Sequence, residues 1–156
     1  MNFSEFLHTV PTFEGFNRQQ LDLLEQTMTV KDFPDGHVFI QGGTSADAMY
    51  LLVDGEIVVT CRRVEGFGHD ELGRIQAGEL FGLVALIDHG PRSATCKAKG
   101  SVRAAFLPSN AFELLFKGKT HIKYQFQKLI ARQLVYDIKA AISLLTRVKP
   151  SAHPIE

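Results

Sequence analysis

The chain has 156 residues, of which 45% are hydrophobic, so it has the size of one domain and can bury one core. Its 17 basic and 17 acidic side chains cancel, which excludes a whole-chain field that would attract nucleic acid or an anionic membrane. No run reaches the ~18 apolar residues of a membrane span, and the start lacks the pattern of a signal peptide, so we expect a cytoplasmic protein.

The N-terminal region, residues 2–29, is predicted to be helical. In the stretch FNRQQLDLLEQTM, Asn17 is a suitable N-cap because Gln20 follows three residues later. The next apolar residues recur at helical spacing: Leu21, Leu24 and Met28. A short helical turn is expected before this helix, around residues 3–7.

The central region, residues 30–107, alternates short β-rich runs with Gly, Pro and Asp. This pattern predicts a closed or sandwiched antiparallel β-structure. Asp54 and Gly55 form the clearest hairpin signal, since both central turn positions accept positive φ. Within this region, LVALID lacks such punctuation and is predicted to form one short helical turn.

The C-terminal region, residues 109–148, is predicted to be helical again. A short helix should begin with Ser109 as its cap and end at Gly118. A long helix should then run from about Thr120 to Val148 and end before Pro150, leaving residues 150–156 as a tail. Residues 1–149 are thus expected to form a single domain, and the eight residues beyond Val148 are too few for a helix-turn-helix.

The long final helix carries a heptad-like apolar pattern. Steps of three and four residues, typical of a coiled-coil seam, connect Ala131, Leu134, Ile138, Ala141, Leu145 and Val148. Two interpretations stay open at this point: the seam of a homodimer, or a stripe buried within the chain's own core. An earlier and wider apolar face suits packing on the chain's own β-structure, and it consists of Ile122, Phe126, Leu129 and Ile130.

The residues that often carry catalysis or bind metals are scattered. Cys61 and Cys96 stand alone in apolar runs and are expected to be reduced core thiols. The histidines have no ligand spacing, so a metal-binding β-barrel enzyme has little support: His8, His37, His69, His89, His121 and His153. We therefore expect no metal and no cofactor.

A candidate anion site lies in the stretch GELFGLVALIDHGPRSAT, residues 78–95. Gly82 permits close approach of a ligand to the backbone, just before the predicted short helix. Arg92, ten residues later, has a guanidinium fork suited to phosphate oxygens. The alternative interpretation is a surface turn with a solvated arginine.

This stretch resembles the phosphate-binding cassette of the cyclic nucleotide-binding domain family. FPDGHVFIQGG, MYLLVDGEIVVT and KLIARQLVYDIKAAISLL are similar to the family's first strands, central hairpin and long C-terminal helix, so the resemblance spans about residues 14–148. It implies a mainly β fold with flanking helices: an antiparallel β-roll (jelly-roll, or double-stranded β-helix) with an N-terminal helix, a short cassette helix and a long C-terminal helix. It also implies a cyclic nucleotide as ligand and a sensor function without catalytic residues.

The resemblance assigns site residues position by position. The phosphate-binding positions are Gly82, Leu83, Ala85, Arg92 and Ser93, and the base and ribose pocket is formed by Val59, Leu72, Phe81 and Asp137. A plain core role for Val59 and Leu72, or a solvated surface role for Asp137, fits the sequence equally well. The carboxylate of Asp137 could accept from guanine N1–H and N2–H or from the adenine 6-amino group, and Ser93 is compatible with either base, so both ligands stay open and we expect cAMP in preference to cGMP.

Leu83 departs from the family pattern, which normally has a glutamate that accepts a hydrogen bond from the ribose. Losing a charged hydrogen bond of about 1.5–3 kcal/mol would weaken binding roughly ten- to a hundred-fold. Two interpretations therefore stay open. The first is a regulatory domain that binds a cyclic nucleotide and signals through its last helix, either as a homodimer or to a protein partner. The second is a degenerate domain that serves dimerisation or docking, or that binds a different small anionic ligand.

Overall fold

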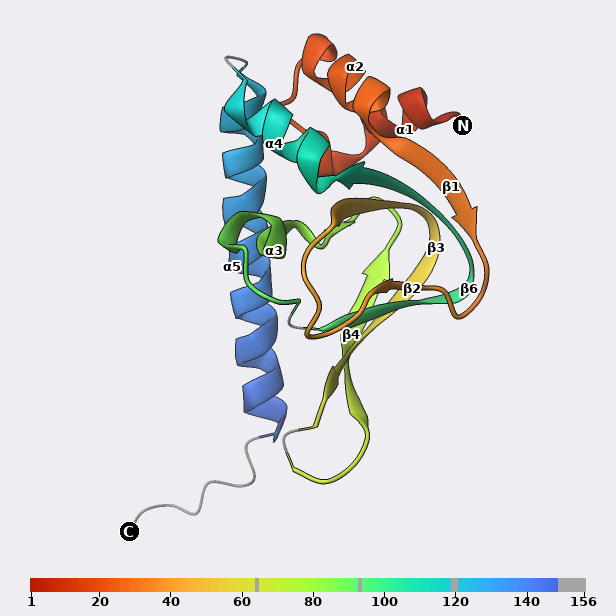
Figure 1. Ribbon diagram of the computed structural model, residues 1–156, viewed down its shortest axis with the longest axis vertical. Helices are drawn as coiled ribbons and strands as arrows, with labels where there is room; N and C mark the ends of the chain where they lie inside the picture. The colour runs from red at the N-terminus through yellow and green to blue at the C-terminus, as the bar shows by residue number, and fades with distance from the viewer. Residues whose placement is uncertain (64, 93, 119–120, 149–156) are drawn as a thin grey trace.

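The computed structural model describes residues 1–148 apart from 64, 93 and 119–120. It shows an antiparallel β-structure flanked by helices from both ends of the chain, which confirms the predicted fold class (Figure 1). The expectations for Ser93, Thr120, Pro150 and the tail lie outside the described residues. The single-domain boundaries stay a prediction.

The N-terminal helices are fixed by local caps. Asn17 Oδ1 accepts from the N–H of Gln20 at 2.8 Å and Gln20 Oε1 accepts from the N–H of Asn17 at 2.9 Å, which confirms the predicted capping box. A second box, between Asn2 and Glu5, was not predicted and starts the first helix. The N-terminal elements are α1 (Phe3–Thr9), the 3₁₀ turn η1 (Pro11–Phe13) and α2 (Arg18–Thr27).

The sheet is built on two long central strands that pair with each other. All of its pairings are antiparallel, in the order β1-β6-β3-β4, while β2 pairs with β6 and β5 pairs with β3. The strands are β1 (Thr29–Phe33), β2 (Val38–Ile40), β3 (Ala48–Arg62), β4 (His69–Gln76), β5 (Leu80–Phe81) and β6 (Thr95–Pro108). The curvature of β3 and β6 brings the sheet around into the roll seen in Figure 1.

The prediction of a hairpin at Asp54 and Gly55 was wrong. Strand β3 continues through both residues, and its register against β6 shifts on either side of Asp54. Of the two residues, only Gly55 has positive φ, at 102°, whereas a two-residue hairpin turn of type I′ needs two such positions. The dipeptide therefore forms a β-bulge that bends the strand.

The remaining helices agree with the sequence analysis except at one cap. LVALID forms α3 (Leu83–Asp88) as predicted, and Gly118 ends α4 (Ser109–Lys117). Ser109 is not the cap of α4: Pro108 holds that position, and the N–H of Ser109 donates to the carbonyl of Asp47 at 2.8 Å. The last helix is α5 (Ile122–Val148), close to the predicted range.

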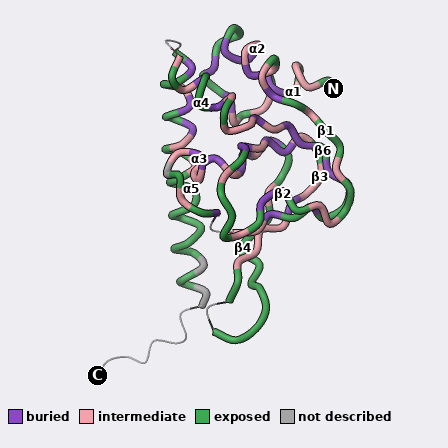
Figure 2. Tube along the Cα trace, viewed as in Figure 1, coloured by how far each residue is buried: buried purple, intermediate pink, exposed green. Residues whose placement is uncertain are grey.

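Helix α5 is anchored at its beginning and exposed along the rest of its length (Figure 2). The ring of Phe126 is fully buried and meets Phe16 and Phe112 edge-on, with centroids 5.8 and 5.7 Å apart. The predicted apolar face at the start of α5 is thus packed, against α4 and the segment before α2 among other parts of the core. All four of its residues join this core: Ile122, Phe126, Leu129 and Ile130. From Arg132 onward the described α5 residues are exposed, apart from the half-buried Gln133.

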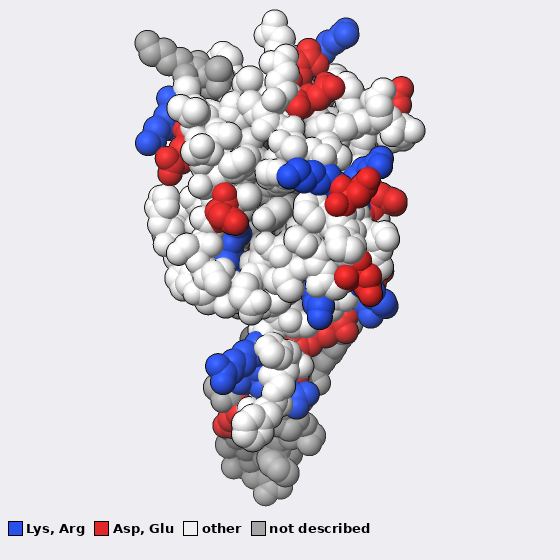
Figure 3. Space-filling view, turned by 45° about the vertical axis from the view of Figure 1, so that its right-hand side comes forward, with Lys and Arg blue, Asp and Glu red and all other residues white. Residues whose placement is uncertain are grey.

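The face of the molecule seen in Figure 3 carries mixed charges, and the described helices include no candidate membrane span. Basic and acidic side chains alternate on the face seen in Figure 3. Within residues 1–148, as far as they are described, no helix is long and apolar enough to cross a membrane. The mixed charges on this face agree with the balanced charge of the sequence.

Substitution of Gly55 by Ala should destabilise the protein strongly. A Cβ at Gly55 would lie 2.8 Å from the carbonyl oxygen of Ser101, and φ is 102°. Gly68→Ala is a matched control, since Gly68 has φ 103° and nothing within 4 Å of its added Cβ. We expect Gly55→Ala to lower the free energy of unfolding by about 2 kcal/mol more than Gly68→Ala, measured by urea denaturation. Equal losses would contradict the close-approach argument.

Candidate functional site

A cavity of about 710 Å³ lies between the roll and helix α5. Its walls come from β3, β4, β5, α3, the segment before β6, and the side of α5 that faces the roll. The structure brings together at this cavity every described residue assigned to the phosphate and base sites: Gly82, Leu83, Ala85, Arg92, Val59, Leu72, Phe81 and Asp137. Residues as far apart in the chain as Val59 and Asp137 therefore meet at one site.

One end of the cavity is a tight backbone turn at Gly82. Gly82 caps α3 in the left-handed conformation, with φ 79° and ψ 6°. The first turn of a helix has N–H groups without intrahelical acceptors, so the backbone from Leu83 to Ala85 offers donors here. These donors suit an anionic group bound at the wall of the cavity.

The guanidinium of Arg92 lies directly behind this turn. Arg92 is only 5% exposed, Nη1 donates to the carbonyl of Gly82 at 2.7 Å, and Nη2 donates to the carbonyl of Ala48 at 2.7 Å. A Cβ at Gly82 would lie 2.7 Å from Nη1, so this position requires glycine. The alternative of a surface turn with a solvated arginine is thereby excluded.

Asp47 adds a partner for Arg92 that the sequence analysis missed. Its Oδ1 lies 3.4 Å from Nη2 of Arg92, while its own side chain is 79% exposed. Nothing in the sequence pattern around Asp47 indicates this role, because the contact joins residues 45 positions apart. The buried guanidinium is therefore not left unpaired when no anion is bound.

Leu83 faces the protein core as well as the cavity. It is 2% exposed and packs with the core cluster that includes Phe13 and Phe126. The nearby carboxylate of Glu79 lines the cavity and accepts a hydrogen bond from the N–H of Gln76 at 2.6 Å. The cavity wall beside the Gly82 turn is thus apolar at position 83.

The roll side of the cavity is largely apolar. Phe81 stacks on Tyr50 with ring centroids 5.1 Å apart, and burial, helped by the charge of Asp47, raises the pKa of Tyr50. Burial also raises the pKa of the Cys96 thiol to about 11, so this cavity-lining thiol stays neutral. Leu72 lines the cavity but is 41% exposed, which places it at the rim.

Helix α5 supplies the polar side of the cavity. Asp137 lines it as predicted, and Gln133 Nε2 donates to Asp137 Oδ1 at 3.0 Å. Burial raises the pKa of Asp137, and this hydrogen bond opposes the shift. The sequence analysis missed Arg132, Gln133 and Tyr136, which line the same cavity. Helical spacing counted from Asp137 would have indicated Gln133, one turn earlier.

A second face of α5 points away from the cavity and is apolar. Its exposed residues are called here the outer stripe, and successive members are one, three or four residues apart: Ala131, Leu134, Val135, Ile138, Ile142 and Leu145. Leu134, Ile138 and Leu145 are 40%, 58% and 70% exposed, which contradicts the alternative of a stripe buried in the chain's own core. Ala141 lines the cavity instead, and the side chain of Val148 lies outside the described part.

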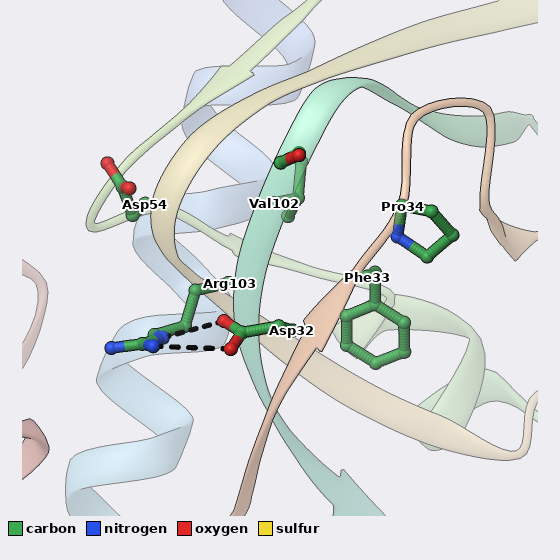
Figure 4. A pocket seen from close by; sticks show the side chains of 7 residues that line it. Asp32, Phe33, Pro34, Asp54, Val102 and Arg103 are labelled. Atoms are coloured by element: carbon green, nitrogen blue, oxygen red, sulfur yellow. Dashed lines mark hydrogen bonds and ion pairs between the residues drawn. The ribbon is translucent and has the colours of Figure 1, made fainter.

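A shallower hollow of about 580 Å³ lies outside the roll, at the end of β1 (Figure 4). Arg103 donates to Asp32 through Nε and Nη2 at 2.8 and 3.2 Å, and this pairing lowers the pKa of Asp32. The two residues face each other across the β1–β6 pair, so they tie these strands together. The hollow contains none of the predicted site residues.

The cysteines and histidines in the described part of the chain form no metal site. Both thiols are free, Cys96 buried and Cys61 only half-buried, so Cys61 is not the core thiol that was predicted. Among the described residues, no group of three His, Cys, Asp or Glu side chains is arranged to hold a metal ion. His153 lies outside the described residues.

Comparison with known proteins gives one family. The family model of the cyclic nucleotide-binding domain matches residues 30–119. The chain is 32% identical over 114 residues to the cAMP-dependent protein kinase type II regulatory subunit of Drosophila melanogaster, covering 72% of this chain and 30% of that protein. It is 25% identical over 130 residues to the CRP-like cAMP-activated global transcriptional regulator of Mycobacterium tuberculosis, covering 83% of this chain and 58% of that protein.

The fold is similar to a solved structure as well. A cyclic nucleotide-binding domain from Methylobacillus flagellatus superposes with a TM-score of 0.79 at 21% identity, covering 95% of this chain and 81% of that one. The chain spans 30% and 58% of the lengths of the two curated relatives, so it corresponds to a part of each.

The two thiols should differ sharply in reactivity. At pH 8, a maleimide should modify the half-buried Cys61 quickly and the buried Cys96, with its pKa of about 11, only after denaturation. We expect Cys61→Ser to remove the fast reaction and Cys96→Ser to leave it unchanged, as counted by mass spectrometry. A fast reaction that persists in Cys61→Ser would show that the cavity wall at Cys96 is open.

Proposed function

The chain belongs to the cyclic nucleotide-binding domain family, and on that premise we propose that it is a sensor domain that binds cAMP, in preference to cGMP, in the cavity under α5. The observation that carries the proposal is the buried Arg92 guanidinium behind the Gly82 turn, in the wall of that cavity. A cyclic phosphate at this turn would accept from the backbone donors of α3 and from the remaining Arg92 donors.

The preference for cAMP rests on the relatives and on α5. The two curated relatives are described as cAMP-dependent and cAMP-activated. The carboxylate of Asp137 is an acceptor suited to the 6-amino group of adenine, although it also suits guanine N1–H and N2–H. The names of the relatives therefore support cAMP over cGMP.

The proposed role is regulatory and not catalytic, and the proposed location of the protein is the cytoplasm. The relatives are a regulatory subunit of a protein kinase and a transcriptional regulator, and both names describe regulation. The ligand would contact α3 at one end and α5 at the other, and α5 is anchored only at its beginning. Binding would shift the population toward a state with α5 closed over the base, and so signal to a protein partner or to a second copy.

A second candidate function is a degenerate fold used for docking, or for a different small anion. Leu83 favours it, because this buried side chain supplies no hydrogen-bond acceptor to a ribose. Asp47 and two carbonyls also satisfy Arg92 within the chain. Titration of the nucleotide-stripped protein separates the two, since the docking module would bind neither cAMP nor cGMP.

Loss of Arg92 should abolish nucleotide binding. The charged hydrogen bonds of the Arg92 guanidinium are the main compensation for the phosphate charge. Arg92→Ala should therefore weaken cAMP binding at least about 100-fold in calorimetric titration. Arg103→Ala, which removes an arginine from the outer hollow, is the matched control and should bind as the native protein does. If Arg92→Ala misfolds, Arg92→Lys keeps the charge without the fork. Native affinity in a folded Arg92 variant would refute the phosphate site.

The outer stripe of α5 is the proposed homodimer surface. Its residues fall on one side of the helix with the heptad spacing of a two-stranded coiled coil, and five of them are 40–70% exposed. An apolar stripe of this length on a soluble domain favours association over solvation. Because the cavity lies on a different face of α5, a ligand would not compete with the partner helix.

A charge in the outer stripe should therefore separate the protomers. Ile138→Glu places a carboxylate at the centre of the stripe and should weaken dimerisation at least about tenfold, read by analytical ultracentrifugation. Ser143→Glu adds the same charge on an exposed α5 position outside the stripe and should leave the dimer intact. A native protein that is monomeric at all concentrations, or an Ile138→Glu dimer of native affinity, would contradict this surface.

A further inference from the structure

The charges of this chain cancel overall but not along its length. Residues 117–149 contain eight Lys and Arg side chains and one carboxylate, that of Asp137, whereas residues 1–116 contain nine basic and fifteen acidic side chains. The basic part consists largely of α5. Such a separation of charge between two parts of a chain points to a partner of opposite charge for one of them.

Three of these cations form a row along α5. Lys128, Arg132 and Lys139 are four and seven residues apart, and eleven residues make about three helical turns, so the three side chains leave the helix on the same side. All three are exposed, and the row, called here the basic row, extends over roughly 17 Å of the helix. Asp137, the one carboxylate in the α5 sequence, stands two residues before Lys139 and therefore faces another side.

The basic row has no carboxylate partner among the described residues, in contrast to the cations of the roll. None of the ion pairs between described residues includes Lys128, Arg132 or Lys139, and the ammonium of Lys128 lies 4.6 Å from the ring centroid of Tyr124 instead. Four arginines of the roll pair with carboxylates of the same chain: Arg63, Arg74, Arg92 and Arg103. The cations of the row can therefore pair with carboxylates of another molecule.

The basic row runs between the cavity and the outer stripe. Arg132 is exposed and also lines the cavity, which places it at the rim. Val135 of the outer stripe stands three residues after Arg132 and four before Lys139, so the row lies beside the stripe. A segment bound along the row would pass the mouth of the cavity and leave most of the outer stripe uncovered.

We propose that the basic row binds a short acidic segment of a protein partner. Carboxylates two residues apart on an extended segment are about 6.6 Å apart, close to the rise of about 6 Å from Lys128 to Arg132. Residues 1–116 have a net negative charge, so an extended polyanion such as nucleic acid or a membrane would also meet repulsion. A short segment contacts the row alone. Binding at the row requires no nucleotide, so the proposal goes beyond the proposed function.

The test uses hexaglutamate as the probe and hexaglutamine as its neutral control. Each peptide is titrated at low ionic strength into the isotope-labelled, nucleotide-stripped protein, and the backbone amide shifts are followed by NMR. We expect saturable shifts centred on residues 128–139 with hexaglutamate and none with hexaglutamine. The absence of shifts with hexaglutamate, or shifts centred on another part of the surface, would overturn the proposal.

Paired variants separate the row from the charge of the whole chain. Lys128→Ala combined with Lys139→Ala should weaken hexaglutamate binding about fivefold, because two exposed ion pairs are lost. Lys117→Ala combined with Lys123→Ala removes the same charge from exposed positions outside the row and should bind as the native protein does. Arginine at positions 128 and 139 keeps both charges and should retain the affinity. Equal weakening in the two alanine pairs would show that position does not matter and would contradict the row.

The other anionic partners are outcomes of the same experiment. Vesicles of phosphatidylcholine with phosphatidylserine, and a DNA duplex, take the place of the peptide. Tighter binding of either one than of hexaglutamate, lost in Lys128→Ala with Lys139→Ala, would overturn the acidic segment in favour of that partner. The same variant should bind cAMP with native affinity, so loss of peptide binding and loss of nucleotide binding are distinguished.

Discussion

The cavity depends on the burial of one positive charge. The guanidinium of Arg92 joins three places that are far apart in the chain: the turn before α3, the start of β3, and its own loop before β6. A charge that is 5% exposed requires acceptors, and the carbonyls of Gly82 and Ala48 with the carboxylate of Asp47 provide them. This arrangement also requires that position 82 carry no Cβ. The geometry of the anion end therefore follows from satisfying Arg92.

Helix α5 connects this site to the surface because its two ends have different environments. Its beginning is held by fully buried side chains such as Ile122 and Phe126. Further along, one face of the helix lines the cavity and another carries the outer stripe. A helix that is packed at one end and solvated along the other is able to move at low cost in buried area. A ligand and a second protomer would thus act on the same element from different sides.

Much of the site could be predicted, but only the part that lies close together in sequence or matches a family motif. Gly82 and Arg92 belong to one short motif, and Asp137 was placed by its position in the long helix. Asp47 was missed because its contact with Arg92 joins residues 45 positions apart and leaves no local pattern. Gln133 was missed for another reason, since glutamine on a helix surface has no distinctive signal until its partner and the cavity are known.

The sequence by itself determined the features that depend on neighbours within a few residues. The Asn17 capping box, the short helix α3 and the long helix α5 form where local hydrogen bonds and helical periodicity favour them. Only the tertiary structure decided what Asp54 and Gly55 do: pairing of β3 with β6 on both sides of the dipeptide makes a bulge more favourable than a turn. The same holds for α5, whose apolar positions look alike in sequence. Packing against the roll, helix α4 and the segment before α2 decides which of them are buried, which line the cavity and which stay exposed.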